Sequence, residues 1–134
     1  MSIDLLKQYY RAFNDGDSEG MLALLADGVV HDINQGEREV GRVQFAKFLK
    51  HMEECYSEQI IHLALMGDDS GTRFAAEFTV VGRYLKADPG FPAARGQSYR
   101  LPAGAFFEIE GGQITRVTTY YNLKDWLKQV GEVT

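Results

Sequence analysis

Asp32 is the residue whose type and setting most favour acid–base chemistry. It follows Val29 and Val30 in an apolar run that is typical of a short strand. An inward-pointing carboxylate there would lie in an apolar cavity, where desolvation raises its pKa and lets it carry a proton between two carbons of an enolisable substrate. The competing interpretation is an aspartate at a strand end that caps a turn or faces water. We favour the general base.

Tyr9 is the second candidate, as a hydrogen-bond donor. It shares a helical face with Leu5, Leu6 and Phe13, so its ring is expected to be buried and its hydroxyl to need a partner. A substrate carbonyl is one such partner, and a backbone carbonyl of the core is the other. Tyr10 can exchange roles with Tyr9.

The neighbours of Asp32 add two polar candidates. Successive side chains of a strand alternate between its faces, so Asn34 is expected on the same face as Asp32, where it would orient a substrate. The same alternation sends His31 to the opposite face, as a surface or dimer contact. A β-bulge that reverses the register would instead make His31 the base.

Metal and cysteine chemistry find less support. His51 and Cys55 are four residues apart, as ligands on one helical face would be, but the sequence has neither a His-Glu-x-x-His motif nor paired Cys-x-x-Cys motifs. We therefore predict no metal and no cofactor. Cys55 is expected near a helix C-terminus, where the dipole raises the pKa of a thiol, so a cysteine nucleophile is not expected.

The elements that must position these residues follow from periodicity and turn residues. Apolar residues recur with a helical period in the first part of the chain and with a period of two after residue 60. The first predicted elements are a helix over 3–14 that ends at Asp15-Gly16 and a short helix that carries Met21 to Leu25, is capped by Asp17 and ends at Asp27-Gly28. A strand from Val29 to Asn34 that pairs with Glu39-Val40 follows, and then a helix that begins beyond Gly41 and ends at about Cys55. The last elements are strands over 60–66, 72–84, 97–109 and 114–121 and a final helix that is capped by Asn122 and ends at Gly131.

Helices first and long antiparallel strands afterwards predict an α+β fold, in which a strongly curved sheet packs on the three N-terminal helices and a short C-terminal helix follows. Phe78 shares one face of its strand with Ala76, and Phe107 shares a face with Ala105. Small residues among large ones leave room for a pocket, and the alternative is that each of these is an ordinary core residue. The segment Leu85 to Gly96 is longer than a hairpin needs and would form a lid over it, with Phe91 at the tip.

Composition bounds the class of protein. The chain has 134 residues, 45% of them hydrophobic, and we treat residues 1–134 as one domain. Its net charge of -5, with scattered basic residues, argues against nucleic acid or an anionic membrane as the main partner. The single cysteine, Cys55, excludes an internal disulfide framework and is compatible with a reducing compartment, so we expect a cytoplasmic protein.

Several segments together resemble a known superfamily. They are Gln8 to Asp17, Leu24 to Asp32, Gly41-Arg42 at the start of a helix, and Gly112 to Leu123. Their order and spacing resemble the nuclear transport factor 2-like superfamily, and within it the branch of ketosteroid isomerases and SnoaL-like polyketide cyclases. The resemblance implies a cone-shaped fold whose curved sheet and helices enclose an apolar cavity, in a homodimer formed through the sheet face.

The ketosteroid isomerase pattern, carried over by this resemblance, puts the general base on Asp32 and the oxyanion-donating tyrosine on Tyr9. The second oxyanion donor, a protonated aspartate, falls on Ala105 or a close neighbour, where there is no carboxyl group. Loss of one such donor costs about 2.7–4 kcal/mol of transition-state stabilisation, so efficient steroid isomerisation is in doubt. Either another donor, such as Tyr121 or Asn34, replaces it, or the substrate enolises more readily, or the chemistry differs.

The sequence therefore predicts a cofactor-independent isomerase or cyclase that acts by proton transfer on a small apolar, enolisable ligand of steroid or polyketide type. The alternatives are a non-catalytic domain that only holds a ligand in the cavity, and a sheet face around Glu77, Thr79, Val81 and Arg83 that pairs with another chain. The residues predicted to contact the ligand are Asn34, Phe13, Met52, Phe78, Ala105, Phe107, Thr119, Tyr121, Trp126 and Phe91.

Overall fold

The computed structural model describes residues 2–131, and its elements follow the predicted order of helices and then long strands. In chain order they are α1 (Ser2–Asn14), α2 (Ser18–Leu22), β1 (Leu25–Ile33), β2 (Arg38–Val40), α3 (Arg42–Cys55), β3 (Tyr56–Gly67), β4 (Arg73–Tyr84), β5 (Gln97–Glu110), β6 (Gln113–Tyr121) and α4 (Leu123–Val130).

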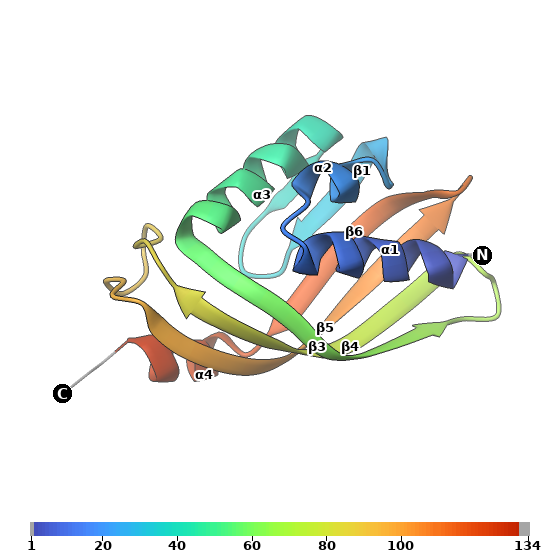
Figure 1. Cartoon of the computed structure of the whole chain (residues 1–134). Coiled ribbons are helices and arrows are strands. Elements are labelled where there is room, and N and C mark those ends of the chain that lie inside the picture. Colours follow the sequence, from blue (N-terminus) through green and yellow to red (C-terminus); the bar gives the residue numbers. More distant parts are fainter. Residues whose placement is uncertain (1, 132–134) are drawn as a thin grey trace.

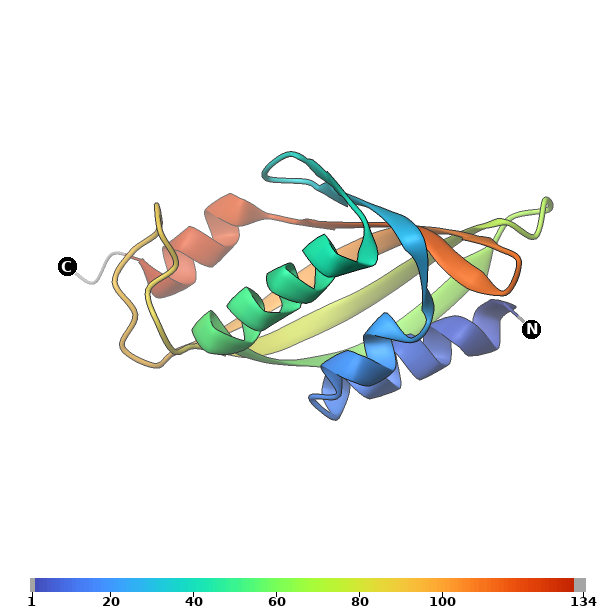
Figure 2. The same ribbon diagram turned by 90° about the horizontal axis from the view of Figure 1, so that it is seen from above.

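The strands form a six-stranded sheet in the order β2-β1-β6-β5-β4-β3. Neighbouring strands are antiparallel except β1 and β6, which run parallel. Figures 1 and 2 show that the sheet is strongly curved and that α1, α2 and α3 lie on its concave side, while α4 lies at one end against β5. The predicted α+β fold is confirmed.

The inner face of the sheet carries the alternation that the sequence predicts. In β4 and β5, Ala76 pairs with Ala105 and Phe78 with Ala103, and all four side chains are buried. The intervening residues of β4, such as Glu77 and Val81, are exposed on the outer face. A period of two places one set of side chains toward the helices and the other toward solvent.

The second helix is shorter than predicted, and its expected end at Asp27-Gly28 is wrong. Helix α2 begins after Asp17, whose side chain accepts a hydrogen bond from the backbone N–H of Gly20 at 2.9 Å, and it ends at Leu22. The chain is already in β1 at Leu25, which pairs with Ile114 of β6. Sheet pairing therefore overrides the local helical pattern.

The far end of the sheet is closed by α4 and by the loop over 85–96. Asn122 caps α4 by accepting a hydrogen bond from the Asp125 N–H at 3.1 Å, as predicted. This cap orients the helix so that Trp126 is buried, with its ring 5.1 Å from that of Tyr84 and 5.3 Å from that of Phe91. The loop thereby meets α4 at the same end as the last turn of α3 (Figures 1 and 2). None of the helices within residues 2–131 has the length and apolar character of a membrane crossing.

Candidate active site

The concave side of the sheet and the helices enclose a cavity of about 400 Å³ with a mainly apolar wall. A volume in this range suits a small organic molecule. All of the predicted ligand-contacting residues except Ala105 and Phe107 line it: Asn34, Phe13, Met52, Phe78, Thr119, Tyr121, Trp126 and Phe91.

Ala105 and Phe107 do not reach the cavity, although both are buried on the inner face of β5. The rings of Tyr9 and Tyr10 pack edge-on against Phe107, at 5.6 and 6.0 Å between centroids, and these tyrosines line the cavity in its place. Ala105 pairs with Thr119, whose longer side chain reaches the cavity. The face of β5 was predicted correctly, but helix α1 covers that part of it.

His31 lies in the cavity wall, on the inner face of β1. Its ring is packed between Phe45 and Phe48 of α3, with centroid distances of 4.7 and 4.5 Å, and only 6% of the residue is exposed. The Nδ1 atom is buried without a hydrogen-bond partner. Burial lowers the pKa of His31 to about 4, against the opposing pull of the nearby Asp32 charge, so the imidazole is neutral at pH 7.

Asp32 points away from the cavity, so the predicted inward orientation is wrong. Arg38 donates to Oδ1 through Nε at 2.6 Å, and Arg116 donates to Oδ2 through Nε at 2.8 Å. These hydrogen bonds lower the pKa of Asp32 to about 2. A carboxylate neutralised by two guanidinium groups outside the cavity is a weak base.

The alternation along β1 explains this exchange of faces. Val29 is buried, and two residues later His31 takes the same inner face, while Val30 and Asp32 take the other. The pairing of β1 with β6 also shifts register between Leu25 and Val30, an irregularity of the kind that would make His31 the inward residue. Asn34 nevertheless lines the cavity, because β1 ends at Ile33 and strict alternation ends with it.

Tyr9 lies where the sequence predicts, with its ring buried in the cavity wall. Burial raises the pKa of its hydroxyl above the ordinary value of tyrosine. The hydroxyl therefore stays protonated and available as a donor over the physiological range. Its role toward a ligand stays a prediction.

Glu58 of β3 is a cavity residue that the sequence analysis missed. Tyr99 donates a hydrogen bond to its Oε2 atom at 2.5 Å, and burial raises the pKa of the carboxyl group. The alternating strand pattern gave no sign of it, because an acidic residue between Ser57 and Gln59 is expected to face solvent. The curvature of β3 and the long side chain of Tyr99 cover it instead.

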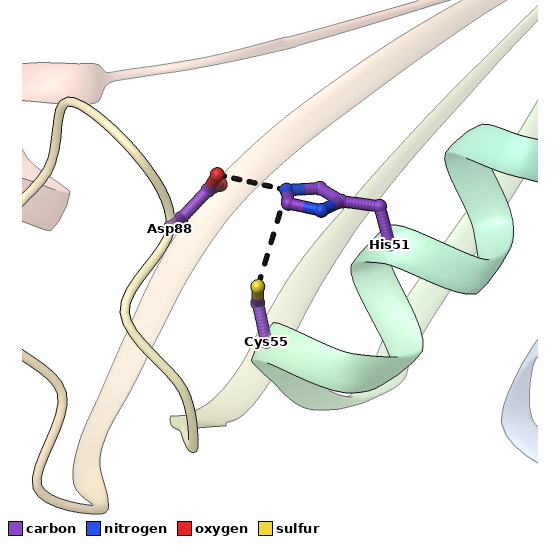
Figure 3. A group of neighbouring side chains, drawn as sticks. All are labelled: His51, Cys55 and Asp88. Atoms are coloured by element: carbon purple, nitrogen blue, oxygen red, sulfur yellow. Dashed lines mark hydrogen bonds and ion pairs between the residues drawn. The ribbon is translucent and has the colours of Figure 1, made fainter.

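A second polar group joins helix α3 to the 85–96 loop (Figure 3). His51 Nε2 and Asp88 Oδ1 are 2.8 Å apart, and the hydroxyl of Tyr56 donates to Asp88 Oδ2 at 2.6 Å. The thiol of Cys55 lies 3.9 Å from the same Nε2 atom of His51. His51, Tyr56 and Asp88 all line the cavity. The length of the loop was the one sign in the sequence that it carries a functional residue, and it did not single out Asp88.

Comparison with known proteins identifies the family. A sequence model described as a SnoaL-like domain matches residues 6–117. The chain belongs to the SnoaL-like domain family. No curated protein matches the chain significantly.

Several solved structures are similar to this chain in fold, and some of them also in sequence. A "putative polyketide cyclase" from Pseudomonas putida is 54% identical, with a TM-score of 0.93 over 95% of this chain and 96% of that chain. Another from Xanthomonas campestris is 52% identical, with a TM-score of 0.92 over 96% of each chain. An NTF2-like protein from Burkholderia xenovorans is 14% identical, with a TM-score of 0.75 over 96% of this chain and 95% of that chain, and shows the same fold.

Within this SnoaL-like fold, polar groups from several elements line the cavity, and three of them are ionisable groups from separate parts of the chain. His31 belongs to β1, Glu58 to β3, and Asp88 to the loop before β5. The position predicted for a second oxyanion donor, Ala105, has no polar side chain and does not line the cavity. The cavity therefore offers a neutral imidazole and buried carboxyl and hydroxyl groups, an arrangement suited to moving protons on an apolar ligand.

Proposed function

We propose that this SnoaL-like protein is a cofactor-independent isomerase or cyclase that transfers protons on a small apolar, enolisable molecule of polyketide or steroid type. The observation that carries the proposal is the neutral imidazole of His31, with an unpartnered Nδ1, in the wall of an apolar cavity of about 400 Å³. The "putative polyketide cyclase" structures that share more than half of its residues support the same reaction class.

His31 is the proposed general base in place of Asp32. Its neutral ring accepts a proton from a carbon next to a carbonyl group, and the electron pair of the broken C–H bond moves to the carbonyl oxygen as an enolate. An isomerase then returns the proton to another carbon. In a cyclase the enolate carbon instead attacks a second carbonyl group, and the alkoxide oxygen formed there takes the proton back from the imidazolium. A base of low pKa suffices where the developing enolate lies beside the imidazolium and is itself stabilised by hydrogen bonds.

Tyr9 and Glu58 are the proposed donors to that enolate oxygen. Burial raises the pKa of both groups, and for Glu58 the hydrogen bond from Tyr99 acts in the opposite direction. In its protonated form Glu58 would donate a hydrogen bond, as a protonated aspartate does in ketosteroid isomerase. Glu58 would thus replace the donor that Ala105 cannot supply. Tyr99 holds one oxygen of Glu58 and leaves the other for a ligand.

The test is proton exchange, which needs no knowledge of the natural substrate. A steroid enone and an aromatic β-ketoester are incubated with the protein in D₂O, and the loss of the hydrogen next to the carbonyl is followed by NMR. A positioned general base contributes about 10²–10⁴-fold, so His31→Gln is expected to lower the exchange rate by that factor. Asp32→Asn is the matched control on the adjacent residue and is expected to keep the exchange rate within about threefold, because its side chain lies outside the cavity.

Two results would contradict the proposal. Equal exchange rates for His31→Gln and the unchanged protein would exclude His31 as the base. Binding of the probes to the cavity with no exchange above buffer would favour the alternative, a domain that holds a ligand without turning it over. Circular dichroism of each variant separates loss of the base from loss of the fold.

We further propose that the chain works in the cytoplasm as a homodimer through the outer face of the sheet. That face carries Phe106 and Tyr120, both nearly half exposed and packed edge-on with centroids 5.6 Å apart, and the exposed Val81. Exposed aromatic residues that touch one another are typical of a contact surface. Sedimentation of the protein and of Phe106→Glu is expected to give a dimer and a monomer, and a monomer in both cases would contradict the proposal.

A further inference from the structure

Three side chains of different donor type converge at the end of the cavity where α3 meets the loop (Figure 3). His51 and Cys55 occupy successive turns of α3, and Asp88 comes from the loop. One imidazole nitrogen, the Cys55 sulfur and one carboxylate oxygen all lie within 4.8 Å of one another. The helix alone supplies two donors, and the third arrives only when the loop folds back.

The arrangement differs from a nucleophile relay. In a relay the carboxylate and the nucleophile contact opposite nitrogens of the histidine, so that the ring passes a proton between them. Here both approach the same nitrogen: Nε2 is 2.8 Å from Asp88 Oδ1 and 3.9 Å from Cys55 Sγ. Three donor atoms gathered around one nitrogen fit a shared cation better than a relay.

The distances suit a small tetrahedral ion after a modest adjustment. Bonds of about 2.0–2.3 Å from zinc to nitrogen, oxygen and sulfur separate neighbouring donor atoms by about 3.3–3.6 Å. The nitrogen and oxygen would move apart by about half an ångström from 2.8 Å. The sulfur would move in from 3.9 Å to the nitrogen and from within 4.8 Å to the oxygen. The side chain of His51 is 43% exposed and has room to turn, whereas Cys55 is buried, so His51 and Asp88 would make most of this adjustment.

The carboxylate is also held in place by a second layer of hydrogen bonds. Tyr56 donates to Asp88 Oδ2 at 2.6 Å, so Oδ1 is the oxygen presented to His51. The Asp88 backbone N–H donates to the hydroxyl of Tyr84 at 2.9 Å, and that hydroxyl donates to the carbonyl of Pro92 at 2.7 Å. Metal-binding carboxylates are commonly oriented by partners of this kind.

We propose, against the absence of a metal predicted from the sequence, that His51, Cys55 and Asp88 bind a zinc ion at the wall of the cavity, with its fourth position open toward the cavity. The proton transfer proposed for His31 does not depend on this ion. A thiolate and an imidazole favour zinc over magnesium or calcium, which prefer oxygen ligands. Three protein ligands with one free position are typical of a zinc ion that takes water or a ligand oxygen. Because His51 and Asp88 line the cavity and Cys55 does not, the ion would lie between the thiol and the ligand space.

Cobalt(II) is the probe that tests the site, because it reports the ligands as well as the affinity. The full-length protein is freed of metals with a chelator and titrated with Co²⁺ and then with Zn²⁺. We expect one equivalent of cobalt to give a thiolate charge-transfer band and the intense visible bands of a tetrahedral ion, both removed by zinc. Cys55→Ser is expected to abolish the charge-transfer band, and Asp88→Asn to weaken binding about a hundredfold or more.

Two further variants separate a site from general metal uptake. Tyr56→Phe removes only the hydrogen bond that orients Asp88, and it is expected to weaken cobalt binding about 10–100-fold. His62→Asn replaces an exposed histidine of β3 and is expected to change nothing. Asparagine tolerates the positive φ of 56° at that position.

The proposal is overturned if cobalt binds without a charge-transfer band, if Cys55→Ser or Asp88→Asn binds as tightly as the unchanged protein, or if His62→Asn loses binding equally. Failure to bind a stoichiometric amount of either ion overturns it as well. Circular dichroism confirms that each variant is folded before titration. The measurement uses no organic ligand, so its outcome is independent of the proton-exchange test of His31.

Discussion

His31 and Asp32 are adjacent in the chain, yet they lie in opposite electrostatic settings on the two faces of β1. His31 faces the cavity between two phenylalanine rings and has no partner for Nδ1. Asp32 faces outward between Arg38 and Arg116. The pKa of each is lowered, to about 4 and about 2, but by different causes: burial for the histidine and hydrogen bonds from cations for the aspartate.

The environment of each side chain, rather than its chemical type, therefore decides whether His31 or Asp32 can act as a base. A carboxylate is the more familiar base for enolisation, but the arginines stabilise its charged form and occupy both oxygens. The imidazole of His31 is neutral at pH 7, buried, and without a hydrogen-bond partner at Nδ1. The same alternation of side chains that buries one residue exposes its neighbour.

The substitution His31→Asp puts the carboxylate on the inner face and tests the comparison most severely. In that apolar wall the carboxylate must stay charged without a partner or take up a proton, and either way the free energy of unfolding at pH 7 is expected to fall by about 3–5 kcal/mol. Because protonation relieves the burial of charge, the variant should regain stability on acidification to pH 5. Urea unfolding at both pH values measures this. A variant as stable as the unchanged protein at pH 7 would mean that position 31 is solvated.

His31 and Asp32 are expected to change the free energy of unfolding of the unchanged protein in different pH ranges. The pKa of His31 is about 4 in the folded protein and about 6.5 when unfolded, so between these values the unfolded state binds more protons. Stability is expected to fall by about 3 kcal/mol as the pH drops from 6.5 to 4. The comparison is urea unfolding of the protein and of His31→Gln over this range. Parallel curves for the two proteins would show that His31 is not the buried neutral group described here.

The substitution Asp32→Asn measures how much the ion pairs of Asp32 with Arg38 and Arg116 contribute to stability. The folded pKa of about 2 lies below the ordinary 3.8, so the contribution of Asp32 is present above pH 4 and is lost as the pH falls through 2. Solvent screening reduces it, and we expect a loss of about 1 kcal/mol at pH 7 that shrinks in high salt. Asp27→Asn is the matched control, because Asp27 pairs with Arg42 at 3.0 Å but its side chain is 94% exposed. Equal losses for the two variants would contradict a special setting for Asp32.

The two arginines that hold Asp32 should contribute unequally. The side chain of Arg38 is 61% exposed, and that of Arg116 is 22% exposed and also lies 3.7 Å from Glu108. Arg38→Gln is expected to lower the unfolding temperature only slightly, because an exposed ion pair contributes little to stability, and Arg116→Gln is expected to lower it more. Thermal unfolding of the two variants side by side measures the order. The reverse order would mean that the two hydrogen bonds from Arg38 to Asp32 outweigh the greater burial of Arg116.

Much of the fold could be predicted from local sequence. The aromatic stripe of α1, the caps at Asp17 and Asn122, and the alternation in β4 and β5 each depend on residues close together in the chain. The end of α2 could not be predicted, because Leu25 leaves the helical pattern to pair with Ile114, far away in the sequence. Local preferences are weak beside such pairing.

The candidate site was predictable in part. Tyr9, Phe78 and Trp126 line the cavity as predicted, because large apolar or aromatic side chains with a regular period have one favourable side on which to be buried. Glu58 and Asp88 were missed, because a carboxyl group in a strand or loop is expected in water unless something distant covers it. Glu58 is covered by Tyr99, which donates a hydrogen bond to it. Asp88 is covered because the loop turns back onto α3 and Tyr56.

Local residue order determined the class of fold, the period of each element and the apolar character of the cavity wall, since those properties depend on neighbours within a few positions. Tertiary structure decided which face of β1 is inside. Val29 and Val30 are both apolar, so a period of two fits either phase, and the choice between His31 and Asp32 depends on how β1 pairs with β6 and where Arg116 lies. Tertiary structure also brings Asp88 close to His51 and Cys55, because the position of a loop depends on contacts with residues that are distant in the sequence.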